Sequence, residues 1–358
     1  MSKFHTLKVI DIVNETADTV SVAFEVPDNL KQEFSYKQGQ YLTFKFSING
    51  EELRRSYSIC SSPADENELR VAIKKVKEGR MSTFINEKIK VGDTMEVMIP
   101  MGNFYTELDP SNQKNYILFA GGSGITPILS ILKTALKLEP LSTVTLFYGN
   151  NDESSIIFKK QIEAIAEANT DRFRAFHILS SFPAGHHALL QGLMTKEKNI
   201  ELIKNYVNTA ADNEYFVCGP GPMMDSTAAA LKELKIDEAK IHIEYFSAPV
   251  TPIIVNAATE IKEKTHGIAL IILDGDRHTV ELKPKETILE AALRIGLDAP
   301  FACQGGSCCT CRALLESGKV QMAVNYALSA SEVKQGYILT CQSRPTTETV
   351  TVNYDKGL

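Results

Sequence analysis

The stretch Cys303-Gln-Gly-Gly-Ser-Cys-Cys-Thr-Cys311, followed thirty residues later by Cys341, decides how this chain is interpreted. If Cys309 is left aside, the spacing is C-x4-C-x2-C with a distant fourth cysteine. Three thiolates on such a short loop can surround a metal group only if the backbone curls tightly. We expect Gly305 and Gly306 to allow that curl, because glycine reaches positive φ and lets backbone amides point at the sulfurs.

This is the spacing of plant-type [2Fe–2S] ferredoxins. The alternative is a structural zinc site with four cysteine ligands, but zinc usually takes its ligands from two separated C-x2–4-C pairs. We therefore predict that a [2Fe–2S] cluster is ligated by Cys303, Cys308, Cys311 and Cys341. Inclusion of Cys309 would give C-x5-C-x-C, which suits no cluster type, so we interpret Cys309 as a small buried filler.

Composition limits the class of protein. A chain of 358 residues predicts two or three domains, and 44% hydrophobic with 23% charged residues is typical of globular proteins. The net charge of −6 and the lack of a basic run argue against nucleic-acid binding. We find no apolar stretch of membrane-spanning length and no signal-peptide pattern after Met1. Seven cysteines, four of them in cluster spacing, suggest no disulfide framework and fit a reducing cytoplasm.

The first hundred residues alternate short apolar runs with turn signals. Runs of this length and spacing predict an antiparallel β-barrel. The runs are Leu7–Val13, Thr19–Val26, Tyr41–Ser47, Arg55–Cys60, Leu69–Val76 and Thr94–Ile99.

Two motifs in this region predict a site for an anion. Arg55-Ser-Tyr57-Ser58 lies near a strand end, and the stretch 79–85 (GRMSTFI) is a glycine turn with a Ser/Thr cap that opens an amphipathic helix. A helix N-terminus with free amides, paired with a guanidinium, suits a pyrophosphate. Each motif also has a simpler interpretation: an Arg and a Tyr are often an exposed strand pair, and Ser82 could be a plain helix cap.

The pair of motifs resembles the ferredoxin–NADP reductase superfamily, whose barrel binds FAD. The resemblance implies that Arg55 holds the pyrophosphate, Tyr57 stacks on the isoalloxazine and Ser58 hydrogen-bonds near flavin N5. Some reductases of this superfamily carry FMN, but the pyrophosphate-type cap favours FAD. The remaining flavin contacts implied by the resemblance are the diphosphate cradle and the adenine side, formed by Gly79, Met81, Ser82 and Thr83, and by Lys74 and Val76.

The middle of the chain predicts a nucleotide-binding domain. The apolar run 116–120 leads into a glycine loop and a helix that reaches about Leu138. Only glycine lets the backbone approach a phosphate or nicotinamide closely, and no Gly-Lys-Ser/Thr follows, so the loop is not a Walker A motif. Further strands at 142–148, 174–179 and 214–217 predict a doubly wound α/β sheet. The candidate cradle residues are Gly121, Gly122, Thr126 and Pro127.

A sharp turn, Cys218-Gly219-Pro220, follows the last of these strands, at a sheet edge where ligands bind. The resemblance implies that this turn packs beside the nicotinamide, and that Glu244 and Phe246 match the family's terminal Glu-x-Phe near the flavin. The segment around Glu244 is equally compatible with a simple edge strand. The catalytic group implied by the resemblance is Tyr57, Ser58, Cys218 and Glu244.

Two positions favour NADH over NADPH. Reductases of this type that prefer NADPH commonly place Arg after the Tyr-Gly-Asn turn and after a Leu-Ser pair, where this chain has Asn151 and Ser181. A 2′-phosphate favours a guanidinium fork, and both forks are missing. Lys196, His186 or His187 could replace the missing guanidiniums only if the loop places their side chains near the 2′-phosphate.

The carboxy-terminal region predicts a tethered ferredoxin. Residues 247–265 have two prolines and no periodicity, which is typical of a linker. Strands at 268–273 and 278–282 flank a glycine turn, and Thr287, Glu290 and Gly296 give a complete helix signature. Strand, hairpin, helix and cluster loop follow the β-grasp order. The predicted parts are an FAD-binding barrel (1–110), a nucleotide-binding α/β domain (111–247), a linker (248–264) and an α+β ferredoxin domain (265–358).

This order resembles the reductase components of bacterial multicomponent oxygenases, most closely the phenylacetyl-CoA epoxidase reductase-like group. The resemblance implies electron transfer from NAD(P)H through FAD and a [2Fe–2S] cluster to a diiron or Rieske oxygenase. Two alternatives remain open: a reductase for a cytochrome P450 or a desaturase, and a non-catalytic iron–sulfur protein. The sequence does not identify the terminal acceptor, the oligomeric state or the domain arrangement.

Overall fold

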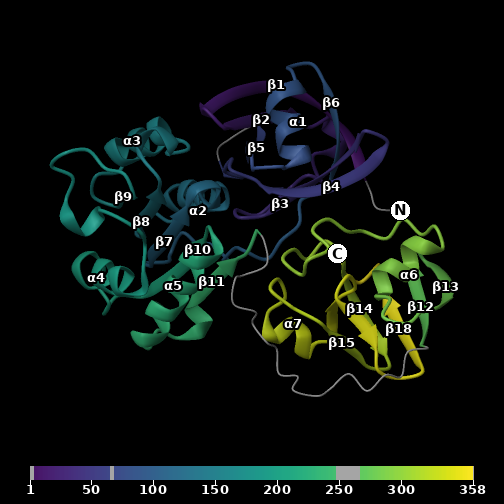
Figure 1. The fold of residues 1–358 in the computed structure, drawn as a ribbon. Helices are drawn as coiled ribbons and strands as arrows, with labels where there is room; N and C mark the ends of the chain where they lie inside the picture. Colours follow the sequence, from purple (N-terminus) through teal and green to yellow (C-terminus); the bar gives the residue numbers. More distant parts are fainter. Residues whose placement is uncertain (1–3, 65–67, 247–266, 358) are drawn as a thin grey trace. The chain divides into compact units, whose positions relative to one another are not determined.

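The computed structural model describes residues 4–64, 68–246 and 267–357 of the chain (Figure 1). The chain divides into two units, and each is described by itself. One unit contains most of an antiparallel sheet followed by a parallel sheet, and the other contains the carboxy-terminal sheet together with residues 4–5 and 54–56. The predicted linker at 248–264 lies outside the described residues. Within the described ranges, no helix is both long and apolar enough to cross a bilayer.

The first sheet is antiparallel and closes on itself, with strand order β4-β3-β6-β1-β2-β5. A bridge between Ile59 and Val71 joins its two outer strands, and buried rings of Phe24 and Phe44 lie 5.5 Å apart in its core. Helix α1 packs against β3 and β5. The elements are β1 (Phe4–Thr16), β2 (Thr19–Glu25), β3 (Tyr41–Ile48), β4 (Glu51–Ser58), β5 (Leu69–Lys74), α1 (Arg80–Lys88) and β6 (Thr94–Met98).

The second sheet is parallel throughout, with strand order β11-β10-β7-β8-β9. Helix α2 packs on β7, β8 and β10, while Tyr206 of α4 contacts the rings of Phe147 and Phe176, so the sheet is doubly wound. The elements are β7 (Asn115–Gly121), α2 (Ile125–Leu138), β8 (Thr143–Asn150), α3 (Lys159–Ala168), β9 (Phe173–Leu179), α4 (Lys196–Tyr206), β10 (Asn213–Cys218), α5 (Gly221–Glu233) and β11 (Ile241–Glu244).

The strand order of this sheet reverses between β7 and β10. The chain runs from β7 to β8 and β9 on one side, then returns to β10 and β11 on the other. In open α/β sheets, ligands bind at the carboxyl ends of the strands beside such a reversal. The fold therefore places the glycine loop after β7 next to the Cys218 turn after β10.

Helix α2 also connects the parallel sheet to the barrel through buried contacts. Ser130 Oγ donates to the carbonyl of Ser61 at 2.6 Å, and the hydroxyls of Ser62 and Thr134 lie 3.0 Å apart. Apolar side chains of both sheets share one core around this helix. Because buried hydrogen bonds and a common core hold the two sheets together, residues from both can build one site.

The carboxy-terminal sheet has the order β13-β12-β18-β14-β16, with β12 and β18 parallel. Asp274 and Gly275, both at positive φ, form the hairpin turn. Thr287 and Glu290 form the predicted capping box. The elements are β12 (Ile268–Leu273), β13 (Asp276–Glu281), α6 (Ile288–Arg294), β14 (Arg312–Ser317), β15 (Val320–Met322), α7 (Ala330–Lys334), β16 (Tyr337–Leu339), β17 (Ser343–Pro345) and β18 (Thr349–Asn353).

Candidate functional site

Strand β4 carries the three residues of the predicted flavin motif. Arg55 is exposed, and its Nη1 donates to the carbonyl of Arg54 at 2.7 Å. Tyr57 is half-buried, with its ring 5.8 Å from that of Phe44. Ser58 is buried at 3% exposure. Side chains alternate along a strand, so Arg55 and Tyr57 share a face while Ser58 points the other way.

Ser58 meets Glu244, the last residue of the parallel sheet. Its hydroxyl donates to Glu244 Oε2 at 3.3 Å. Burial raises the pKa of Glu244 to about 8, although the hydrogen bond from Ser58 lowers it. Cys218 is paired in register with Glu244, and its pKa is raised by burial and by that neighbouring carboxyl. Three of the four residues predicted to be catalytic therefore lie together, and Tyr57 adjoins Ser58 in sequence.

The start of helix α1 differs from the prediction of a Ser/Thr cap. Gly79 is the N-cap, and no side chain among the described residues caps the helix there. Ser82 lies inside the first turn, where its Oγ accepts from Val76 N–H and donates to Gly79 C=O, both at 3.3 Å. A Cβ on Gly79 would lie 2.4 Å from both Ser82 Oγ and Val76 Cγ2, so only glycine fits. The amides of the first turn are consequently available to an anion.

The other residues predicted to bind flavin lie around this turn. Met81 is buried and Thr83 is half-buried, both in α1. Val76 is 56% exposed just before the turn, whereas Lys74 lines a cavity that also contacts the glycine loop. Phe246 is 44% exposed, two residues after β11 ends.

The glycine loop and the Cys218 turn pack directly on each other. A Cβ on Gly124 would lie 2.2 Å from the Cys218 carbonyl oxygen, and one on Gly219 would lie 3.0 Å from Gly121 N. The Tyr148 hydroxyl donates to the Gly122 carbonyl at 2.9 Å. The glycines are needed because any side chain would separate the two turns.

A cavity of about 480 Å³ opens over the carboxyl ends of the parallel strands. Of the residues predicted to bind the nicotinamide nucleotide, Gly121, Gly122 and Pro220 line it, whereas Thr126, Pro127, Cys218 and Gly219 do not. Thr126 instead donates to the Ser123 carbonyl at 3.0 Å. The full lining comprises Lys74, Gly121, Gly122, Gly149, Asn150, Asn151, Ser155, Ile178, Ser180, Gly192, Leu193, Met194, Thr195, Pro220, Pro222, Met223 and Ser226.

Sequence reasoning missed the wall formed by residues 192–195. Met194 of this wall packs against Gly149, since its Sδ would lie only 2.8 Å from a Cβ on that glycine. The positive φ of Gly192 is the only local signal, and a glycine in a loop is too common to indicate a site. Met223 and Ser226 of α5 were missed as well, although they follow the predicted Cys218 turn.

The three side chains considered as substitutes for the missing guanidiniums have other partners. Lys196 Nζ pairs with Glu233 at 2.7 Å. His186 Nε2 lies 3.1 Å from the carbonyl of His177, and His187 Nδ1 accepts from Leu189 N–H at 3.3 Å. None of the three lines the cavity, whose described lining contains a single cation, Lys74.

The cysteine loop curls in a way that partly corrects the prediction. Gly306 has φ +75° as expected, but Gly305 does not adopt positive φ, and Gln304 does so instead at +52°. The Gly305 amide donates to Cys303 Sγ at 3.3 Å. The Gln342 side chain fixes the turn by donating from Nε2 to the Gln304 carbonyl at 2.9 Å. The amides thus point at sulfur, as predicted.

The four predicted ligand cysteines form two thiol pairs. Cys303 Sγ and Cys308 Sγ lie 3.2 Å apart, and Cys311 contacts Cys341. A hydrogen bond from Cys308, opposed by burial and aided by backbone amides, lowers the pKa of Cys303 to about 5. A hydrogen bond from Cys311 similarly lowers the pKa of Cys341. Each pair therefore provides a stabilised thiolate, the form of cysteine that binds metal.

Cys309 lies between these pairs in sequence but is 4% exposed. Its carbonyl accepts from Arg312 N–H at 3.0 Å, where the loop enters β14. Because the predicted ligands Cys308, Cys311 and Cys341 are buried as well, the burial of Cys309 leaves its interpretation as a small filler a prediction.

Three family models match successive parts of the chain. Residues 6–105 match an oxidoreductase FAD-binding domain, and residues 118–229 match an oxidoreductase NAD-binding domain. Residues 271–346, which include all five clustered cysteines, match a 2Fe-2S iron-sulfur cluster binding domain. The zinc alternative is thereby excluded, and FAD and NAD(P)H join the cluster as cofactors.

Relatives match the chain over its whole length. It is 40% identical over 362 residues to a component of the 1,2-phenylacetyl-CoA epoxidase of Escherichia coli (strain K12), with 100% of both chains covered. It is 36% identical to the 3-ketosteroid-9-alpha-monooxygenase, ferredoxin reductase component, of Mycobacterium tuberculosis (strain CDC 1551 / Oshkosh), with 98% of this chain and 96% of the relative covered. Phthalate dioxygenase reductase has the same fold, with a TM-score of 0.58 and 23% identity over 98% of each chain.

Proposed function

This chain belongs to the family of reductases that join FAD-binding, NAD-binding and 2Fe-2S domains in one polypeptide, and we propose that it supplies electrons to a terminal oxygenase. It is an NAD(P)H-dependent flavin and iron–sulfur oxidoreductase. When bound, the flavin takes up the two electrons of a hydride and the cluster relays electrons one at a time. The protein's part is to bind, orient and shield these groups.

The flavin site is built by the barrel and by the end of β11. The first-turn amides of α1 and the Arg55 guanidinium would hold the pyrophosphate, since both favour negative charge. Tyr57 offers an aromatic face, and Ser58 offers a hydroxyl that is fixed by Glu244 at 3.3 Å. Glu244 is protonated at neutral pH because its pKa is about 8. It therefore adds no negative charge to the flavin site.

The cavity over the parallel sheet would hold the nicotinamide nucleotide, and we propose that the nucleotide is NADH. The support is the lack of a guanidinium at Asn151, which lines the cavity, and at Ser181, together with the engagement of Lys196, His186 and His187 elsewhere. The Gly121 loop packs closely on the Cys218 turn, and the side chains of Pro220 and Met223 lie against Gly121 at the cavity.

We propose that Cys303 and Cys308 ligate one iron, and Cys311 and Cys341 the other. The pairing follows the two thiol contacts, since two ligands of one tetrahedral metal must lie within a few ångströms of each other. Amides of Gly305 and its neighbours would stabilise the negative sulfurs once the protons have left. Cys309 has no part in ligation in this proposal.

We choose a terminal oxygenase as the electron acceptor because both full-length relatives are named as parts of oxygenases. The test is to reduce the holoprotein with one equivalent of NADH without oxygen and to mix it with purified diiron or Rieske oxygenases. Reoxidation of the cluster in a stopped-flow instrument, faster than with buffer, and product formed with substrate and oxygen support the proposal. Failure with every oxygenase but success with a cytochrome P450 or desaturase would replace it with the alternative acceptor.

We further propose a cytoplasmic location. None of the seven cysteines, all of which lie in the described residues, forms a disulfide, and cluster ligands must stay reduced until the irons bind. Fractionation of the native host, followed by detection of the protein with an antibody, tests this directly.

A further inference from the structure

Strand β11 is short and lies at the edge of the parallel sheet. It has only four residues, all half-buried, and it lies at the edge of the sheet with β10 as its one neighbour. Short edge strands with few buried contacts open more readily than central strands. Yet the last residue of this strand, Glu244, accepts the hydrogen bond from Ser58 of the barrel. Side-chain contacts of the other residues of β11 therefore bear on where Glu244 lies.

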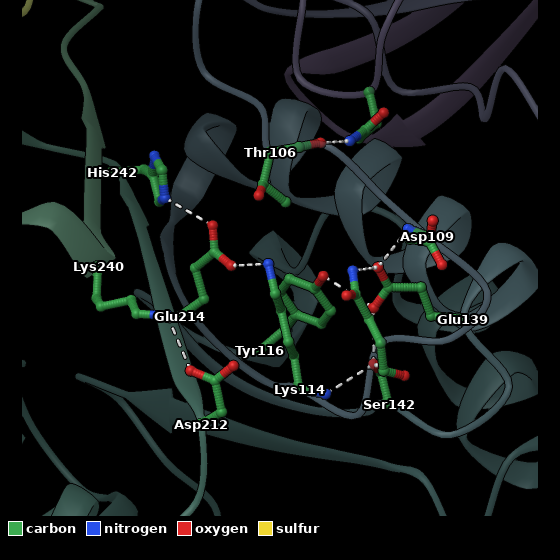
Figure 2. Close-up of polar contacts among 12 residues, drawn as sticks. Thr106, Asp109, Lys114, Tyr116, Glu139, Ser142, Asp212, Glu214, Lys240 and His242 are labelled. Atoms are coloured by element: carbon green, nitrogen blue, oxygen red, sulfur yellow. Dashed lines mark hydrogen bonds and ion pairs between the residues drawn. The ribbon is translucent and has the colours of Figure 1, made fainter.

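His242 provides that contact. Its Nε2 lies 2.9 Å from Glu214 Oε1, and its ring stacks on Phe216 with centroids 4.3 Å apart and planes inclined by 11°. Figure 2 shows the Glu214 carboxylate between His242 and Lys114. An ionised carboxylate can only accept hydrogen bonds, so Nε2 of His242 carries the hydrogen.

Glu214 is itself fixed. Its side chain is 6% exposed, and its other oxygen accepts from Lys114 Nζ at 2.7 Å. Although burial raises the pKa of Glu214, hydrogen bonds from His242, Lys114 and Thr106 lower it to about 2. Lys114 and Thr106 belong to the segment that connects the barrel to β7, so the carboxylate ties that segment to β11 (Figure 2).

The register of the two strands connects this contact to the flavin site. Phe216 pairs with His242 and Cys218 pairs with Glu244. Because side chains two apart point to the same face of a strand, His242 and Glu244 lie in one row, about 7 Å apart along β11. The contact at His242 therefore sets both the register of β11 against β10 and the side of the sheet to which the Glu244 side chain points.

We propose that His242 is a positioning residue for the flavin site, which holds β11 against Glu214 and Phe216 so that Glu244 meets Ser58. This inference rests on the proposed placement of Glu244 beside the flavin. The residue that precedes this strand offers a matched control. Lys240, just before β11, pairs with Asp212 at 2.8 Å, but both side chains are largely exposed, so this pair should contribute little.

The test uses full-length holoprotein with His242→Ala, His242→Gln and Lys240→Met. Flavin reduction by NADH is followed in single turnover from pH 6 to pH 10. We expect His242→Ala to slow reduction at least threefold and to move the pH dependence contributed by Glu244 towards lower pH, because water reaches a loosened carboxyl. His242→Gln should restore both, since its amide nitrogen can take the place of Nε2. Lys240→Met should match the wild type.

A second measurement does not depend on the bound cofactor. In flavin-free protein, hydrogen–deuterium exchange of the amides of 241–246 should be faster in His242→Ala than in Lys240→Met or in the wild type. If His242→Ala does not fold, His242→Phe keeps the stacking, lacks the hydrogen bond and should show the same slowing and the same exchange.

Two results would overturn the inference in distinguishable ways. If Glu244→Gln removes the pH dependence but His242→Ala and His242→Phe leave rate, pH dependence and exchange unchanged, His242 does not position β11 and the role of Glu244 stands. If Glu244→Gln leaves the rate and its pH dependence unchanged, the placement of Glu244 at the flavin is wrong, and the inference is wrong with it.

Discussion

Ser58, at the end of a barrel strand, donates a hydrogen bond to Glu244, at the end of the edge strand of the parallel sheet. The two residues are 186 positions apart in sequence. Their contact joins the part of the unit that matches an FAD-binding domain to the end of the parallel sheet. The carboxyl is half-buried and its pKa is about 8, so this contact is sensitive to pH.

The raised pKa of Glu244 predicts a pH-dependent stability in flavin-free protein. The folded state keeps the proton of Glu244 up to about pH 8, whereas the unfolded chain loses it near pH 4.5. The contribution is therefore fully present below pH 4.5 and is lost as pH rises through 8. We expect Glu244→Gln to be more stable than the wild type at pH 9, by a few kcal/mol (about 1.4 kcal/mol per unit of pKa), but not at pH 4. Urea unfolding at both pH values measures this, and an equal difference at both would contradict it.

Replacement of single cysteines should separate ligand from filler. Cys308→Ser removes a thiol that lies 3.2 Å from Cys303, and we expect loss of the visible iron–sulfur absorbance and of acid-labile sulfide. Cys309→Ser is the matched control, because it changes the neighbouring buried thiol by one atom. It should retain the absorbance, at a stability cost of about 1 kcal/mol for a buried hydroxyl. The reverse pattern would show that the ligands have been misassigned.

Cys341→Ala should separate the two electron-transfer activities. Because Cys341 is in the carboxy-terminal unit, the barrel and the parallel sheet should keep their flavin and nucleotide sites. We expect NADH-dependent reduction of a two-electron dye to stay within twofold of the wild type, while reduction of a one-electron protein acceptor through the cluster falls at least tenfold. Steady-state assays with both acceptors on the same preparation make the comparison. Loss of both activities would mean that the cluster domain supports the flavin site.

Local chemistry predicted most of the elements. The strand at 268–273 was bounded correctly because Asp274 and Gly275 form a turn with two positive φ values. The helix after Thr287 was recognised from a capping box that the structure also contains. In these cases the residues that end an element are neighbours in sequence, so their chemistry can be read without the fold.

The errors arose where side-chain packing decides the structure, and not the residue type at one position. Ser82 resembled a helix cap, but the room around Gly79 is determined by the Val76 side chain, and the helix begins one turn earlier than the hydroxyl suggests. The wall near Met194 faces Gly149 only because strands β8 and β9 carry both loops to the same edge of the sheet. Neither arrangement has a signal in the local spacing of residues.

The nucleotide preference can be tested by restoring the missing guanidiniums. Asn151 and Ser181 lie side by side, since Ser181 N–H donates to the Asn151 carbonyl at 2.6 Å. We expect the wild type to have a kcat/KM for NADH at least tenfold above that for NADPH. The double variant Asn151→Arg with Ser181→Arg should raise kcat/KM for NADPH about tenfold or more, because two guanidiniums can form charge-assisted hydrogen bonds with a 2′-phosphate. Wild-type protein that prefers NADPH would contradict the argument from the missing guanidiniums.

The two glycines of the cysteine loop should tolerate alanine differently. At Gly306, φ is +75° and a Cβ would lie 2.9 Å from Val324 Cγ2, so Gly306→Ala combines backbone strain of about 1–2 kcal/mol with a steric clash. At Gly305, φ is not positive and the nearest atom to a Cβ, the Cys303 carbonyl oxygen, lies 3.7 Å away. We expect Gly305→Ala to incorporate iron and sulfide like the wild type and Gly306→Ala to lose most of both. Iron and acid-labile sulfide analysis of the purified variants decides, and equal loss in the two would mean that the curl depends on Gly305 after all.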